Sequence, residues 1–283
     1  MGVKIICDSA SDITKEMAKE LDVIVLPIKI IFGEEEFLDG VTMGHKEFFE
    51  KLANINELPT TSQISPYDYE EAFKEVVEAG DTAVCITISS KLSGCNQSAH
   101  IGAEEYSDYI SIVDSESVSV SEQILVKLAV KLRNEGKTAS EIVEILNEEK
   151  KNIRIIVLLD TLEYLKKGGR ISSTTALAGS LLGIKPIVSV VEGKVVSVGK
   201  ARGVKNGNST INKLIEKQGG INFDKPFSLA YSGLSDEIVK KYIASSENIY
   251  GEHIKDLSIC TIGSTIGTHT GPGAIIVAFF KNK

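Results

Sequence analysis

Short runs of β-branched residues alternate along the chain with longer stretches in which apolar residues recur every three or four positions. The runs in the first half predict buried strands at residues 3–7, 23–31, 83–88 and 110–113. The longer stretches predict amphipathic helices at residues 66–79, 95–106, 119–134 and 137–150. Strands that alternate with helices are typical of a parallel sheet covered on both faces. The first half is therefore predicted to be an α/β domain.

The pattern changes after residue 150. Strands are expected at residues 153–159, 229–233, 257–263 and 273–280, with helical stretches at 161–182 and 205–218. Residues 187–200 form two apolar runs joined at Glu192-Gly193, which is typical of a β-hairpin. A hairpin indicates a mixed sheet. We therefore expect an α/β fold of two domains, with a parallel sheet in residues 1–150 and a mixed sheet in residues 151–283.

Residues that favour helix ends support these boundaries. Ser65, followed by Pro66 and Asp68, is typical of an N-cap and first turn. Gly80 and Gly136 follow predicted helices, where glycine commonly ends them.

Composition narrows the class of protein. The 283 residues are 42% hydrophobic and 25% charged, which fits two folded domains and excludes a disordered chain. A net charge of −8 argues against a general nucleic-acid binder. No apolar run reaches the roughly 18 residues of a membrane span, and the first residues predict a strand rather than a secretory leader. The four scattered cysteines favour reduced thiols and a cytoplasmic location.

Several motifs with a known mechanism do not occur in the sequence. It contains neither a dinucleotide-binding nor a P-loop glycine pattern, and neither a zinc-protease HExxH motif nor a GxSxG nucleophile elbow. Its four histidines form no spaced pair. We therefore expect no metal, no cofactor and no catalytic residue.

Loops rich in hydroxyls and glycine are the candidate binding elements, because open α/β sheets bind ligands at the carboxyl ends of their strands. Ser93 and Gly94 precede a predicted helix, where free amides favour an anion. A simple N-cap and tight turn would explain the same two residues. Thr60, Thr61 and Ser62 can donate to a carboxylate or phosphate, or act as turn and capping groups.

Two further loops carry candidate residues with structural alternatives. His269 lies between threonines and glycines in the segment 267–273. It either contacts a ligand or is a solvated histidine in a loop. Arg170 follows Gly168-Gly169 and either holds an anion or partner or, as we favour, forms a structural pair with Asp160.

Two other segments also have more than one interpretation. Asp8 and Asp12 come at the end of the first predicted strand, where their carboxylates can bind a metal ion. Alternatively, Ser11 or Asp12 caps a helix that begins near Ile13, and we favour this second interpretation. Residues 173–191 are apolar and rich in small side chains, which suits close packing or an apolar tunnel for a ligand.

Five of these loops together resemble the DegV family in order and spacing over nearly the whole chain. They are DSASD at 8–12, PTTSQ at 59–63, SSKLSG at 89–94, DTLEYLKKGGRIS at 160–172 and GTHTGPG at 267–273. The resemblance implies a bacterial fatty acid-binding protein of the FakB type, with an acyl chain buried in a two-domain α/β fold. Such a protein carries a long-chain fatty acid, such as palmitate or stearate, to a separate kinase subunit, FakA. That kinase phosphorylates the bound carboxylate for phospholipid synthesis.

Carried over by position, the resemblance implies which residues contact the ligand. It assigns the carboxylate to Thr61, Ser62, Ser93, Gly94 and His269. It also implies a surface at Arg170 and Arg202 that faces the kinase or makes transient contact with a membrane.

The sequence departs from the family pattern at several positions. Cys95 stands where threonine is usual, and Ser121 and Gln123 replace glycines, which would reshape the acyl slot if they line it. Residues 200–206 are less basic than in the family.

The expected function is therefore a carrier without catalysis of its own. One alternative is a serine hydrolase or phosphotransfer enzyme that uses Ser93 with His269, although the sequence offers no third group to orient the histidine. Another is a binder of a different amphiphile, or a regulatory module with a vestigial lipid site.

Overall fold

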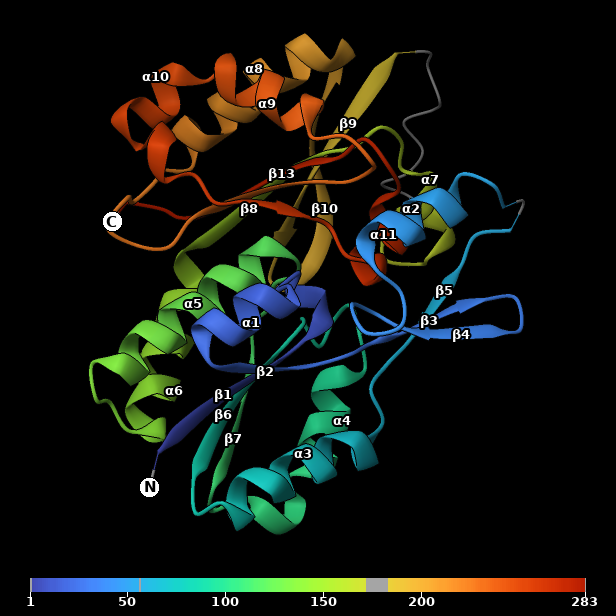
Figure 1. Ribbon diagram of the computed structural model, residues 1–283. Coiled ribbons are helices and arrows are strands. Elements are labelled where there is room, and N and C mark those ends of the chain that lie inside the picture. The colour runs from blue at the N-terminus through green and yellow to red at the C-terminus, as the bar shows by residue number, and fades with distance from the viewer. Residues whose placement is uncertain (1, 56, 172–182, 283) are drawn as a thin grey trace.

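Two β-sheets packed on either side of a shared helix form the frame of the molecule (Figure 1). The computed structural model describes residues 2–55, 57–171 and 183–282. Part of the helical stretch predicted at 161–182, namely residues 172–182, lies outside the described residues. The same holds for residues 173–182 of the apolar segment at 173–191.

The N-terminal sheet is parallel throughout, as predicted, with strand order β2-β1-β6-β7. Its strands are β1 (Val3–Asp8), β2 (Val23–Leu26), β6 (Thr82–Thr87) and β7 (Ile110–Asp114). The helices around it are α1 (Lys15–Leu21), α3 (Pro66–Glu78), α4 (Cys95–Gly102), α5 (Val120–Asn134) and α6 (Ala139–Glu149). Ser65 caps α3 with Asp68 in a reciprocal capping box, and Pro66 is its first residue, as predicted.

The prediction of one strand over residues 23–31 is wrong. The run divides at Pro27 into β2 and β3 (Lys29–Phe32), because proline has no amide hydrogen to continue the ladder. Strand β3 belongs to a separate antiparallel sheet of order β4-β3-β5, with β4 (Glu35–Leu38) and β5 (Thr60–Ser62). Helix α2 (His45–Leu52) packs on it. We call residues 28–62 the inserted segment.

The C-terminal sheet is mixed, also as predicted, with strand order β10-β9-β8-β13-β11-β12. Its strands are β8 (Ile153–Leu158), β9 (Ile184–Val191), β10 (Lys194–Arg202), β11 (Ser228–Tyr231), β12 (Ile259–Thr261) and β13 (Ile275–Phe280). Only β11 and β12 pair in parallel. Glu192 and Gly193 both have positive φ, at 49° and 77°, which the predicted two-residue hairpin turn requires.

The remaining helices of the C-terminal half are α7 (Glu163–Lys167), α8 (Gly203–Lys217), α9 (Glu237–Ala244), α10 (Glu247–Tyr250) and α11 (Ser264–Thr270). Short 3-10 turns occupy Ser9–Ser11, Glu104–Tyr106, Lys150–Asn152 and Gly251–Asp256. Helices α8, α9 and α10 cover one face of the mixed sheet, as Figure 1 shows. Among the described residues, no helix has the length and apolar character needed to cross a membrane.

Helix α5 packs against both sheets (Figure 1). Most of its residues are buried, as expected of a helix that is apolar on more than one face. One cluster of buried side chains therefore includes Ile5 and Ile6 of β1 together with Ile155 of β8 and Ile276 of β13. The strands of the parallel sheet end by residue 114 and those of the mixed sheet start at 153. On that basis we propose the division into residues 1–150 and 151–283.

Candidate ligand-binding site

A cavity of about 410 Å³ lies between the two halves of the molecule. Most of its wall is apolar and comes from both halves. The apolar lining residues are Ile28, Ile88, Leu92, Val118, Ile155, Val157, Leu159, Leu165, Val188, Val190, Val195, Ile266 and Ile276. Cavities of this size and character are typical of small-molecule sites.

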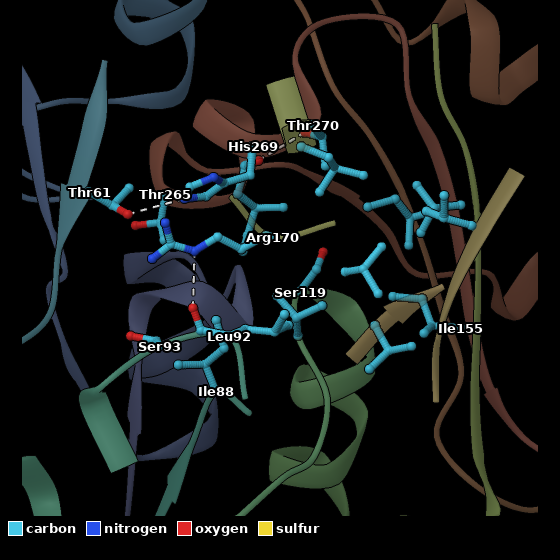
Figure 2. A pocket seen from close by; sticks show the side chains of 18 of the residues that line it. Thr61, Ile88, Leu92, Ser93, Ser119, Ile155, Arg170, Thr265, His269 and Thr270 are labelled. Atoms are coloured by element: carbon cyan, nitrogen blue, oxygen red, sulfur yellow. Dashed lines mark hydrogen bonds between the residues drawn. The ribbon is translucent and has the colours of Figure 1, made fainter. Parts of the chain in front are cut away.

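Polar side chains gather at one end of the cavity. Figure 2 shows Thr61, Ser93, Arg170, Thr265 and His269 at this end, with Ile155 at the opposite end. Ser62 and Gly94 also line the cavity. The structure thus brings together the residues assigned to a carboxylate from three separate loops of the sequence. Arg202 is not among the lining residues and is exposed at the end of β10.

The residues Thr60–Ser62 form strand β5 rather than the loop predicted at 59–63. Thr61 pairs with Ile30 of β3, so the inserted segment holds its hydroxyl at the cavity. Gln63, just after the strand, donates from Nε2 to Ser98 Oγ of α4 at 2.8 Å. That bond ties the end of β5 to the helix that begins beside Ser93.

His269 lies on α11, not in the loop predicted at 267–273. Its Nε2 is 3.1 Å from Thr61 Oγ1, while its buried Nδ1 has no hydrogen-bond partner among the described residues. Burial, reinforced by the positive charge of Arg170, lowers the pKa of His269 to about 4. The ring is therefore neutral at pH 7 and can orient the Thr61 hydroxyl without adding a charge.

Arg170 joins the two halves at the polar end. Its Nε donates to Leu92 O at 3.1 Å and its Nη1 to Gly168 O at 2.5 Å. The predicted structural pair with Asp160 is wrong, because Asp160 instead forms an ion pair with Lys185 of β9. Arg170 thus has a structural role through backbone carbonyls and also contributes its side chain to the cavity wall.

Ser93 precedes the N-terminus of α4, where Gly94 is the N-cap residue. The Ser93 hydroxyl accepts from the Cys95 amide at 3.3 Å and donates to Cys95 Sγ at 3.2 Å. The alternative that Ser93 is the N-cap is therefore wrong, although its oxygen accepts from one free amide of the first turn. It lines the cavity at the same time.

The carboxylates that follow β1 have different roles from the predicted ones. Thr14 caps α1 through the Met17 amide, so the prediction that Ser11 or Asp12 caps it is wrong. Asp12 crosses to the C-terminal half and accepts from the Gly263 amide at 2.7 Å and from Ser119 Oγ at 2.5 Å. Burial raises the pKa of Asp12 to about 8.

Asp8 stays within the N-terminal half, where its carboxylate accepts from the Ala10 and Ile88 amides. Across the described ranges, no group of three or more histidine, cysteine or acidic side chains is arranged to hold a metal ion.

Ser121 and Gln123 lie outside the cavity lining. Ser121 bonds to Ser117 and Val118 within its own turn. Gln123 donates to Asp12 O at 3.1 Å and accepts from Ser228 Oγ of β11 at 3.1 Å. Gln123 therefore connects α5 to its neighbours, and neither residue shortens the slot.

Sequence reasoning missed several polar residues of the wall, namely Ser119, Ser189, Thr265 and Thr270. Ser119 adopts φ 58° and ψ −144°, an unusual conformation for a residue with a side chain. Ser119 was predicted as the first residue of the helix at 119–134, whereas it is the N-cap residue of α5, which begins at Val120. Thr265 lies outside the loop predicted at 267–273, and Thr270 lies within it; both belong to helix α11, which was not predicted.

The fold and the cavity define a class: an α/β protein with one parallel and one mixed sheet, an apolar slot between them, and polar side chains that include an arginine at one end of the slot. The chain belongs to the DegV family, since the family model described as "Uncharacterised protein, DegV family" matches residues 2–282. It is 35% identical over 286 residues to a DegV domain-containing protein of Clostridium acetobutylicum, with 99% of each chain covered.

Solved structures of DegV family and fatty acid-binding proteins are similar to this chain over nearly its whole length. A Thermus thermophilus DegV family protein, described by its fatty acid binding, matches with a TM-score of 0.88 and 29% identity, over 99% of this chain and 100% of that one. DegV of Bacillus subtilis, described as a fatty acid binding protein, matches at 0.83 and 29%, over 99% and 100%. A stearic acid-binding protein of Eubacterium ventriosum matches at 0.85 and 27%, over 99% of each chain.

Proposed function

We propose that the protein is a fatty acid carrier that buries the acyl chain between its two halves and holds the carboxylate at the polar end of the cavity. The observation that carries this proposal is the distribution of polarity in the cavity. A long wall of aliphatic side chains ends in a cluster of hydroxyls and a neutral histidine, beside the side chain of Arg170. The fatty acid binding of the Thermus and Bacillus relatives supports the same ligand class.

The energetics fit an amphiphile with a long tail. Burying each methylene contributes about 0.8 kcal/mol before the costs of association and ordering. Hydrogen bonds to the head contribute about 0.5–1.5 kcal/mol each. The tail therefore supplies most of the affinity. The roles of Thr61, Ser62, Ser93, Gly94 and His269 are to orient the carboxylate through neutral donors.

The polar end also adjoins a second depression of about 390 Å³. Thr61, Arg170 and His269 line both hollows, and the exposed residues Thr60 and Lys167 line the outer one. A carboxylate at Thr61 would thus be reached from outside while its tail stays buried. This arrangement supports presentation of the carboxylate to a separate fatty acid kinase of the FakA type, in the cytoplasm, with the kinase performing the chemistry.

The hydrolase alternative needs Ser93 and His269 to act as nucleophile and base. The hydrogen bonds of Ser93 go to Cys95, and the Nε2 atom of His269 faces Thr61. The carrier therefore fits the geometry better.

Native mass spectrometry of the purified protein, followed by organic extraction, tests the proposal. We expect one long-chain fatty acid per protein molecule. An empty protein that also takes up no added fatty acid would contradict it. Turnover of acyl esters that depends on Ser93 would favour the hydrolase.

A further inference from the structure

Thr265, in the first turn of α11, lies on the cavity wall at the polar end. The backbone amides of Ser264 and Thr265 both donate to the carboxylate of Asp39, which fixes this turn against the inserted segment. Thr265 and His269 both line the cavity. Residues four positions apart lie on the same face of a helix, so Thr265 is one turn before His269 on the wall. Figure 2 shows both side chains at the polar end.

The hydroxyl of Thr265 has no strong partner among the described residues. Its Oγ1 lies 3.5 Å from Ser9 Oγ, beyond the roughly 2.5–3.0 Å of an ordinary hydrogen bond between hydroxyls. The Ser9 oxygen already accepts from the Ile28 amide at 3.0 Å. Thr265 is nevertheless only 3% exposed, and buried hydroxyls are normally hydrogen-bonded. Its proton therefore remains available for a ligand in the cavity.

Two later threonines of α11 differ from Thr265 in this respect. Thr268 donates from Oγ1 to Ser264 O at 2.8 Å. Thr270 donates to Ile266 O at 2.9 Å. Each uses the backbone carbonyl four residues earlier, which a threonine inside a helix can reach. Thr265 lies in the first turn, and the residue four positions earlier belongs to strand β12 rather than to the helix. Its position in the helix thus leaves its hydroxyl proton unused.

Two other donors at the polar end have partners within the protein. The Thr61 hydroxyl lies 3.1 Å from His269 Nε2, and the Ser93 hydroxyl donates to Cys95 Sγ at 3.2 Å. An ionised carboxylate has two oxygens, and each can accept more than one hydrogen bond. Helix α11 packs against β5, which carries Thr61. A carboxylate held at Thr61 can therefore accept a further hydrogen bond from Thr265.

We propose that Thr265 is a specificity-determining residue whose hydroxyl donates to the carboxylate of the ligand. This inference rests on the proposed function and narrows the ligand class to ionised free acids. Hydrogen bonds to a charged oxygen are roughly twice as strong as those between neutral groups. An alcohol of the same chain length buries the same tail but gains less from Thr265. The residue therefore selects the head group, while the aliphatic wall binds the tail.

Binding of palmitic acid and of hexadecanol, measured by equilibrium dialysis at a pH where the acid is ionised, tests this contact. Thr265→Val replaces the hydroxyl by a methyl group of similar volume. We expect it to weaken the binding of palmitic acid about tenfold, for the loss of one charge-assisted hydrogen bond. Binding of hexadecanol should weaken by no more than about threefold, since its bond to Thr265 is about half as strong. Thr265→Ser keeps the hydroxyl and should retain the preference for the acid.

Thr268→Val is the matched control on the same helix. It removes a hydroxyl whose proton is already bonded to Ser264 O. Thr268 lines the outer depression and is not among the residues that line the cavity. The ratio of acid to alcohol affinity should therefore equal that of the wild type. A loss of acid preference as large as in Thr265→Val would overturn the proposal, because the effect would then come from a disturbance of α11.

The same measurements separate this contact from the carrier function. Equal affinity for palmitic acid in the wild type and Thr265→Val would overturn the contact and leave the carrier standing. A loss in Thr265→Val that is equal for the acid and the alcohol would also overturn it, since the hydroxyl would then not distinguish the head groups. A wild type that binds neither compound would refute the carrier and the contact together.

Discussion

Gly168 provides a sharp test of how the polar end is built, because its missing side chain leaves room for His269. A Cβ at this position would lie 2.3 Å from His269 Nδ1 and 2.9 Å from Cε1. Ordinary contact begins near 3.4 Å, so the ring would have to retreat by about 1 Å. The backbone of Gly168 has φ −71° and ψ −9°, which alanine adopts without strain. Gly168→Ala should therefore displace the histidine and leave the fold intact.

The expected cost follows from the 3.1 Å contact between His269 Nε2 and Thr61 Oγ1. A retreat of about 1 Å breaks this bond and leaves the Thr61 hydroxyl free to rotate away from the ligand. Loss of one such hydrogen bond costs about 0.5–1.5 kcal/mol, or roughly a two- to tenfold weaker affinity for fatty acid. Gly199→Ala is the matched control, since a Cβ there would make only ordinary contacts at 3.8–3.9 Å.

Titration calorimetry with saturated fatty acids that differ by two methylenes makes the test specific. Each pair of methylenes should change affinity roughly tenfold in both wild type and variant. The penalty of Gly168→Ala should be the same for every chain length, because head and tail contributions are independent. A penalty that grows with chain length would refute the reasoning, since Gly168 would then shape the tail slot.

Three further predictions test the site and its titrating groups. Combining Thr61→Ala with Ser93→Ala should weaken fatty acid binding by about one to two orders of magnitude without unfolding the protein, and unchanged affinity in calorimetry would show that the head lies elsewhere. Burial raises the pKa of Glu122 well above its ordinary 4.5, because both carboxyl oxygens are buried without partners among the described residues. The folded state therefore keeps a proton that the unfolded state loses, and stability falls as pH rises above about 4.5. In urea unfolding, Glu122→Gln should reduce that fall, and an equal slope in both proteins would contradict the protonated carboxyl. The pH dependence of stability that arises from His269 has the opposite sign, because burial lowers the pKa of this residue from 6.5 to about 4. As pH falls, the unfolded state therefore takes up a proton before the folded state does, and stability is lost between about pH 6.5 and 4. His269→Gln should reduce this acid loss, and a loss as large as in the wild type would contradict a neutral ring.

The regular elements of both sheets were predictable because their patterns are local. The run Ile275–Phe280 is buried along its whole length and Val3–Asp8 from Ile5 onward, so a largely apolar sequence was sufficient evidence. The hairpin at Glu192-Gly193 was predictable because its turn demands two residues with positive φ. These features need no knowledge of distant residues.

The errors arise where a distant residue decides the local structure. The hydroxyls of Thr60–Ser62 suggest a loop, yet pairing with β3 makes them an edge strand. The sequence around His269 is rich in glycine and threonine, which disfavour a helix. Helix α11 forms there because Asp39, 225 positions away, accepts from the Ser264 amide. Tertiary contacts of this kind leave no periodic trace in the sequence.

The candidate site was predictable as a set of residues but not as a geometry. Three hydroxyl loops at strand ends pointed to an anion site, and the cavity lining includes all three. The partners of Arg170 among the described residues could not be anticipated, because they are backbone carbonyls and one of them, Leu92 O, belongs to the other half. The prediction paired Arg170 with Asp160 because both lie in the same segment, whereas in the structure Asp160 forms an ion pair with Lys185 of β9.

The cluster of buried side chains that joins β1 to β8 and β13 across α5 affects how the chain acquires its structure. Two sheets suggest two independent modules, but neither half encloses this core alone. A polypeptide ending near residue 150 would leave the outer face of α5 unpaired, and the complementary fragment would expose the underside of its sheet. We therefore expect each fragment alone to aggregate and the two together to reassemble, so that folding and cooperative unfolding belong to the whole chain.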